Sequence, residues 1–131
     1  MTGLYVDTSA VLKRVFIEDG STQVREILGT RYARGDLVVS SELTWVELSR
    51  ALLRAQVSDV GTHISDACAG IARQPLNPTV MKRAREIGPS GLRSLDAIHL
   101  AAAIDLGATE MLTFDHRLAE AATLVGVNAV P

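Results

Sequence analysis

The sequence contains little cysteine, few aromatic residues and no long apolar segment, and these shortages exclude several classes of protein. Its single cysteine, Cys68, cannot form an internal disulfide, and its small, apolar neighbours predict a buried position in a helix. No apolar run approaches the roughly 18 residues that cross a bilayer, and the first residues lack the basic, apolar and small-residue order of a secretion signal. We therefore expect a cytoplasmic protein without a membrane segment.

Lysine is also scarce, because arginine supplies 11 of the 13 basic residues. The formal net charge of −2 gives no overall indication of nucleic-acid binding. Arginine forms bidentate contacts with phosphate groups, but it is equally common on the solvated faces of helices. Composition alone therefore leaves the class of ligand open.

Short apolar stretches alternate with longer amphipathic ones along the 131 residues, a length that suits one compact domain over 1–131. We expect strands at 3–6, 37–39, 110–114 and 127–130, with a further brief strand within 74–78. We expect helices at 10–17, 21–33, 41–55, 59–73, 79–87, 94–106 and 116–122. Strands that alternate with helices predict a three-layer α/β/α sandwich, in which a central, mainly parallel sheet of about five strands is covered on both faces.

Several residues have the character of helix caps. Ser21, and either Ser40 or Ser41, can accept a hydrogen bond from the first turn of the following helix. Gly35 and Gly107 can adopt the left-handed conformation in which helices commonly end. These residues set the expected helix boundaries.

Two acidic residues, Asp7 and Asp115, directly follow predicted strands. Ligands bind outside the carboxyl ends of parallel strands, so these two carboxylates should lie at the same edge of the sheet. Each also has a simpler explanation, as the N-cap of the helix that follows it. Asp96 likewise lies in the first turn of its helix, where the helix dipole favours a negative charge.

Glu47 is harder to explain by local structure. It lies within a helix between Val46 and Leu48, and a carboxylate on an apolar helix face is costly unless it is paired or bound to a cation. An ion pair with Arg50, one turn further on, is the alternative.

The four acids together predict a metal site, because several carboxylates share a site only with a cation between them. Oxygen ligands without cysteine or histidine favour Mg²⁺ or Mn²⁺. Such a cation can activate water for the hydrolysis of a phosphodiester. Thr8, Ser9 and Thr113 lie beside the acids and can orient ligands or water, although hydroxyls are also common where helices start.

Four segments resemble, in order, the motifs of PIN-domain toxins of the VapC type: YVDTSAVLKRV, LTWVELSRAL, LRSLDAIHLAAA and TFDHRLAEAA. The resemblance extends over residues 5–130 and places the family's metal-binding acids at Asp7, Glu47, Asp96 and Asp115, with Glu42 as an alternative to Glu47. It implies an endoribonuclease that depends on Mg²⁺ or Mn²⁺, acts as the toxin of a toxin–antitoxin pair and cleaves RNA to inhibit translation. It also implies a homodimer that assembles further with a small cognate antitoxin.

Four further residues are candidates for contact with substrate, and three of them also have a structural interpretation. Arg93, near the third motif, is the residue that we select for contact with a substrate phosphate. His99 shares the helical face of Asp96 and could touch substrate, but a packed or hydrogen-bonded role is the expectation. Trp45 and Tyr32 could stack on bases, whereas a core or interface position is the default.

Other protein classes fit the same features less well. A receiver module needs a second acid beside the first strand-end aspartate, and an aspartyl phosphatase needs another aspartate where Ser9 stands. A binding protein that has lost its activity is disfavoured by the four intact acids.

Overall fold

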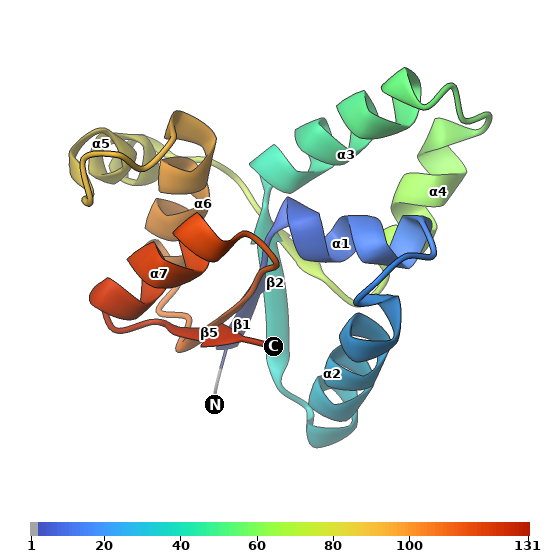
Figure 1. Ribbon diagram of the computed structural model, residues 1–131, viewed down its shortest axis with the longest axis horizontal. Coiled ribbons are helices and arrows are strands. Elements are labelled where there is room, and N and C mark those ends of the chain that lie inside the picture. Colours follow the sequence, from blue (N-terminus) through green and yellow to red (C-terminus); the bar gives the residue numbers. More distant parts are fainter. Residues whose placement is uncertain (1–2) are drawn as a thin grey trace.

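The computed structural model describes residues 3–131, and its centre is a fully parallel sheet (Figure 1). The strand order is β3–β2–β1–β4–β5, with β1 at the centre. The strands are β1 (Gly3–Val6), β2 (Leu37–Ser41), β3 (Ala72–Gln74), β4 (Glu110–Leu112) and β5 (Asn128–Val130). The helices are α1 (Thr8–Val15), α2 (Ser21–Arg34), α3 (Glu42–Arg54), α4 (Val60–Ala67), α5 (Pro78–Glu86), α6 (Ser94–Asp105) and α7 (His116–Leu124).

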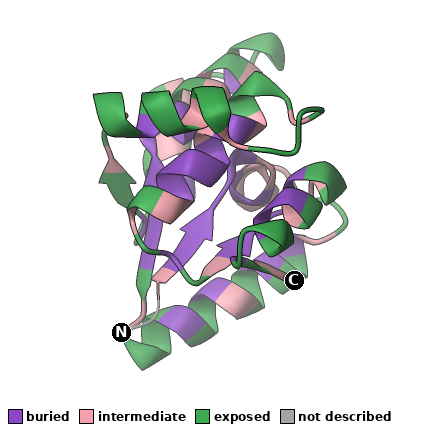
Figure 2. Cartoon of the chain, turned by 90° about the vertical axis from the view of Figure 1, so that its left-hand side faces the viewer, coloured by how far each residue is buried: buried purple, intermediate pink, exposed green. Residues whose placement is uncertain are grey.

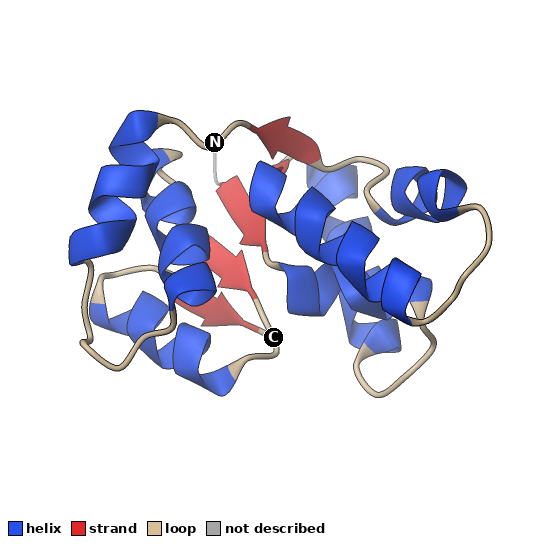
Figure 3. Cartoon of the chain, turned by 90° about the horizontal axis from the view of Figure 1, so that it is seen from above, coloured by secondary structure: helices blue, strands red, loops and turns tan. Residues whose placement is uncertain are grey.

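The helices form two groups on opposite sides of the sheet, α1–α4 on one side and α5–α7 on the other (Figures 1 and 3). Successive side chains of a strand point to opposite faces, so β1 serves both layers. Tyr5 packs into one apolar cluster with Leu100 of α6, whereas Leu4 belongs to the other with Leu48 of α3. Figure 2 shows this buried layer along the strands and on the adjoining helix faces. The predicted three-layer α/β/α sandwich with five strands is confirmed.

The largest error in the predicted elements concerns the helix at 59–73. The structure has the shorter α4, and β3 begins at Ala72 inside the predicted helix. Gly70 breaks the helix, because its φ of +81° is left-handed and an added Cβ would lie 2.7 Å from the Tyr32 ring. The small residues before Gly70 keep a helix-like pattern and hide this break. Cys68 is buried, as predicted, at the end of α4.

The predicted caps are partly wrong. Gly20, and not Ser21, is the N-cap of α2, while the Ser21 hydroxyl donates to the Phe16 carbonyl at 3.1 Å. Ser41 is the N-cap of α3 but makes no side-chain capping bond. Gly35 and Gly107 have φ values of +74° and +69°, as expected of residues that end helices.

The parallel register brings the ends of three neighbouring strands to one edge of the sheet. β1 pairs with β2 on one side and with β4 on the other. Asp7, Ser41 and Thr113 therefore leave the sheet beside one another. No helix within residues 3–131 is long and apolar enough to cross a membrane.

Candidate active site

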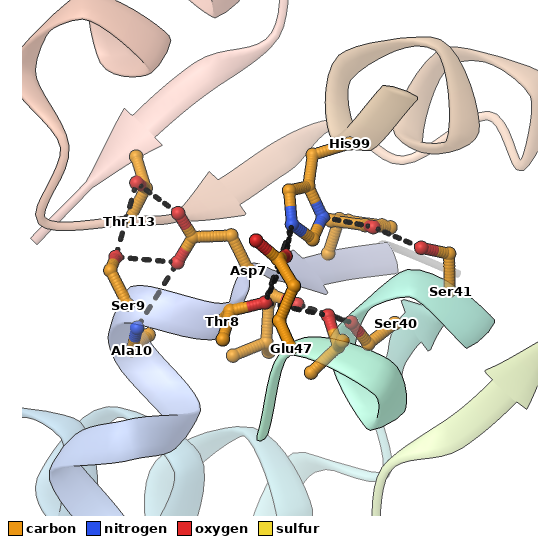
Figure 4. A network of polar contacts seen from close by, with 12 residues as sticks. Asp7, Thr8, Ser9, Ala10, Ser40, Ser41, Glu47, His99 and Thr113 are labelled. Atoms are coloured by element: carbon orange, nitrogen blue, oxygen red, sulfur yellow. Dashed lines mark hydrogen bonds and ion pairs between the residues drawn. The ribbon is translucent and has the colours of Figure 1, made fainter. Parts of the chain in front are cut away.

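Asp7 lies at the centre of the polar contacts at this edge (Figure 4). It is the N-cap of α1, as the simpler interpretation of the sequence predicted, because its Oδ1 accepts a hydrogen bond from the Ala10 amide at 3.1 Å. The same oxygen accepts from Ser9 Oγ at 2.7 Å, and Oδ2 accepts from Thr113 Oγ1 at 2.6 Å. Three donors from two elements therefore fix the carboxylate, which is only 3% exposed.

Burial raises the pKa of the Asp7 carboxyl, and the nearby His99 and the hydroxyl donors lower it by smaller amounts. A carboxylate in this position is costly because it has lost its hydration. No Lys or Arg forms an ion pair with it among the described residues. The charge on Asp7 is therefore held in place and left without an opposite charge in contact.

Glu47 is held by hydrogen bonds to other polar side chains and forms no ion pair with Arg50, so the alternative offered by the sequence is wrong. Its Oε1 accepts from Thr8 Oγ1 at 2.6 Å and lies 2.7 Å from His99 Nε2. A carboxylate oxygen only accepts, so Nε2 carries the proton in this contact. The other ring nitrogen, Nδ1, lies 2.8 Å from the Tyr5 hydroxyl. His99 thus has the hydrogen-bonded role expected of it, between the centre of the sheet and an acid of the site.

The pKa of Glu47 is lowered despite partial burial, because His99 and Thr8 both donate to its carboxylate. The side chain remains 27% exposed. Glu47 therefore stays charged and reaches the surface beside α1.

Asp96 and Asp115 approach from the α6–α7 side. Asp96 lies in the first turn of α6. Its pKa is raised by burial first, then by the negative charges of Asp115 and Asp7, while His99 and Arg93 oppose this rise. Asp115 is the N-cap of α7, where its Oδ1 accepts from the amides of Arg117 and Leu118 at 2.9 and 3.2 Å. Asp96 is therefore close enough to both Asp115 and Asp7 for their charges to repel its own.

These acids do not form a closed metal cage. Within residues 3–131, no group of three or more acidic, histidine or cysteine side chains is gathered closely enough to hold an ion. The donor set nevertheless suits a hard divalent cation, because desolvated carboxylates that repel one another are stabilised by a positive charge and offer oxygen ligands. Asp7 also retains lone pairs beyond its three hydrogen bonds. The residues fit Mg²⁺ or Mn²⁺ by charge and ligand type.

The hydroxyl residues predicted beside the acids contact them directly. Ser9 and Thr113 bind Asp7, and Thr8 binds Glu47. Arg93 is exposed at the N-cap of α6. Glu42, the alternative to Glu47, instead forms an ion pair with Arg73 at 3.3 Å.

The sequence analysis did not predict the buried hydrogen bonds that lie behind Glu47 and Thr8. Tyr5 donates to Ser41 Oγ at 2.9 Å, and Ser40 contacts Thr44 at 2.6 Å. A tyrosine within a short apolar strand is the available signal, because a buried tyrosine hydroxyl usually has a hydrogen-bond partner. The sequence alone does not say which distant residue supplies it.

The remaining aromatic residues occupy structural positions. Trp45 packs, partly buried, against the apolar cluster of α1–α4, and the Arg73 guanidinium lies 5.4 Å from its ring centre. Tyr32 is 38% exposed and donates to the Ala69 carbonyl at 3.1 Å.

Comparison with known proteins agrees with this geometry. The family model described as the PIN domain matches residues 4–124. Ribonuclease VapC47 of Mycobacterium tuberculosis is 37% identical over 131 residues, which cover 98% of this chain and 96% of the relative.

Two solved structures share the fold. Mycobacterium tuberculosis VapC20, described as a toxin that cleaves the sarcin-ricin loop, has a TM-score of 0.68 at 15% identity and covers 90% of this chain and 94% of its own. A toxin–antitoxin complex from Klebsiella pneumoniae has a TM-score of 0.68 at 19% identity, with coverage of 98% and 96%. On the evidence of the matched residues and the curated relative, the chain belongs to the PIN-domain family.

Proposed function

We propose that this chain is a divalent-metal-dependent endoribonuclease, in which Asp7, Glu47, Asp96 and Asp115 hold Mg²⁺ or Mn²⁺. The observation that carries the proposal is the state of Asp7 and Asp96. Both carboxyls have raised pKa values through burial, and neither forms an ion pair with Lys or Arg in the part of the chain described. Uncompensated carboxylates near one another at a strand-end edge support the proposal of a cation site there.

The chain's own residues position the acids. Ser9 and Thr113 fix the two oxygens of Asp7, and Thr8 fixes Glu47. When bound, the cation supplies positive charge that activates water and neutralises the phosphoryl group. Arg93 lies close enough to Asp96 to lower its pKa, so a phosphate beside Asp96 is within reach of a guanidinium.

RNA is the favoured substrate because VapC47 is named a ribonuclease and VapC20 is described as cleaving an RNA loop. The test is cleavage of a mixed RNA pool by the purified chain with Mn²⁺ or Mg²⁺, with EDTA, and with the Asp96→Asn variant. Asp105→Asn is a matched control, because it changes an exposed aspartate at the other end of the same helix. We expect cleavage that requires metal, is lost in Asp96→Asn and persists in Asp105→Asn. Equal cleavage by all three proteins in EDTA would contradict the proposal.

We propose further that the protein acts as a toxin that inhibits translation in the cytoplasm, and that it forms a homodimer which assembles with a cognate antitoxin. The Klebsiella structure is a toxin–antitoxin complex, and exposed apolar side chains such as Ile17 (95%) and Leu124 (73%) are available for interfaces. Induced expression should stop incorporation of labelled amino acids with the wild type but not with Asp96→Asn. Light scattering should give twice the monomer mass, and a monomer at micromolar concentration would remove the dimer from the proposal.

A further inference from the structure

The cations of this chain fall into two groups, those that are paired and those that are not. Four form ion pairs, namely Lys13, Arg31, Arg34 and Arg73. Arg14 instead donates to the carbonyls of Ala67 and Ala69. The other eight have no carboxylate partner among residues 3–131: Arg25, Arg50, Arg54, Lys82, Arg83, Arg85, Arg93 and Arg117.

Unpaired cations are concentrated on the α5–α7 side of the molecule. Residues 78–93 contain four cations and one acid, a net charge of +3 in a chain whose net charge is −2. Lys82, Arg83 and Arg85, which we call the α5 cations, are all exposed. The buried face of the same helix is provided by Val80, so the charges occupy its outer faces.

This positive region borders the helix that carries Asp96. Helix α5 packs alongside α6, and the two lie side by side in Figure 1. The first turn of α6 carries Asp96, and Arg93 precedes it. A hollow between the loop at 89–92 and α7 is lined by Arg117 and also by the acidic Glu120. Cations from three successive helices therefore lie to one side of the acids.

Helix stability explains only part of this distribution. Arg83 and Arg85 lie in the last turn of α5, where cations interact favourably with the helix dipole. Arg93 is at the opposite kind of position, because the N-terminus of a helix is its positive end, and its side chain makes no capping bond. A cation kept there, next to three unpaired ones, indicates an anionic ligand.

We infer that the α5 cations, with Arg93, form the surface that binds the phosphodiester backbone of RNA on one side of the cleavage site. This inference rests on the proposed function and adds the side of the active site along which the bound RNA extends. The physical argument is charge complementarity. The carboxylates of the site offset the charge of the cation that they are proposed to hold, so affinity for the rest of a polyanion comes from cations beside them.

The test measures binding of a fluorescent 12-nucleotide oligouridylate by anisotropy at several salt concentrations, in an Asp96→Asn background that prevents cleavage. The first variant carries Lys82→Gln, Arg83→Gln and Arg85→Gln. Its matched control carries Arg25→Gln, Arg50→Gln and Arg54→Gln, which removes three equally exposed, unpaired charges from the α1–α4 side. Thermal melting of both variants confirms that they fold.

We expect the α5 variant to lose about two units of slope in log affinity against log salt, since each phosphate contact contributes about 0.7, and therefore to bind RNA about 100-fold more weakly at 0.1 M salt. The control should lose less than threefold. Equal losses in both variants, or no loss in the first, would overturn the inference. Equally strong competition by poly-glutamate would also overturn it, in favour of an acidic protein partner. Cleavage of RNA by the wild type with Mn²⁺ tests the proposed function separately, so failure of one does not imply failure of the other.

Discussion

Glu110 at the amino end of the parallel sheet differs from Asp7 and Asp96 near its carboxyl end in whether an arginine of the chain neutralises the acid. At the amino end, Glu110 begins β4 and accepts two hydrogen bonds from the Arg31 guanidinium, at 2.7 and 2.9 Å. The pKa of Glu110 is lowered, first because of these hydrogen bonds. At the carboxyl end, burial raises the pKa values of Asp7 and Asp96.

The difference separates a structural acid from a functional one. The chain neutralises the charge of Glu110 with its own arginine, so this charge contributes to the stability of the fold. Asp7 is held by hydrogen bonds, but neither Asp7 nor Asp96 forms an ion pair with Lys or Arg, so their charges lower stability, and under the proposed function a bound cation would remove this penalty. The predictions below test this contrast in order of decreasing effect.

The largest effect should come from Asp96→Asn. We expect RNA cleavage to fall by at least about 100-fold, because loss of a metal ligand should cost no less than loss of a residue that supports one. Stability without metal should rise, because the repulsion from Asp115 and Asp7 is removed. Cleavage rates and urea unfolding of the same preparation measure both effects. If the variant is inactive and also less stable, Asp96 is a structural acid, and the contrast with Glu110 is contradicted.

The converse change is Glu110→Gln at the other end of the sheet. It should leave cleavage unchanged and lower the free energy of unfolding by about 2 kcal/mol, because the nearly buried Arg31 loses a charged hydrogen-bond partner. Urea denaturation measures the loss. Retention of full stability would show that the ion pair contributes nothing.

The pH dependence of unfolding should have opposite signs for the two ends. The contribution of the Glu110 pair is complete above the ordinary pKa of 4.5 and is lost as the pH falls through the lowered pKa in the folded state. The penalty from Asp7 and Asp96 is complete at neutral pH and is relieved as the pH falls from their raised pKa values towards the ordinary 3.8.

Metal-free unfolding followed from pH 3 to pH 7 checks these signs. Glu110→Gln should flatten the loss of stability in acid, and Asp96→Asn should flatten the decrease in stability as the pH rises above 3.8. Unchanged curves in both variants would mean that other groups control the pH dependence.

Tyr5→Phe should have the smallest effect. It removes the hydroxyl that lies against His99 Nδ1 and should lower stability by about 1 kcal/mol. Cleavage should fall by less than about tenfold, because Glu47 keeps its contact with Thr8. Tyr32→Phe is the control, since that hydroxyl only binds the Ala69 carbonyl at the surface. Equal loss of cleavage in both variants would show that the buried hydrogen bonds of Tyr5 have no role at the site.

The sequence predicted the fold because its strands are short apolar runs and its acids follow those strands. The strand ends at Asp7 and the helix that carries Asp96 could be located from local pattern alone. The break at Gly70 could not, because it depends on the Tyr32 ring, which packs against the loop from a distant helix.

The sequence predicted which residues belong to the site better than it predicted the contacts between them. Glu47 was correctly singled out as an acid that needs a partner, but the alternative to a cation, an ion pair with Arg50, is not what the structure has. The actual partner, His99, is 52 residues away along the sequence, and Tyr5, which contacts His99, is 94 residues from it. Periodicity indicates which face of a helix is buried but not which distant side chain meets it.

The most direct test of the central claim is calorimetric titration of Mn²⁺ into the wild type and into Asp96→Asn, without RNA. We expect saturable binding to the wild type, binding at least tenfold weaker or undetectable in Asp96→Asn, and unchanged binding in Asp105→Asn. If the variant binds Mn²⁺ as tightly as the wild type, the acids at the carboxyl end of the sheet are not the metal site.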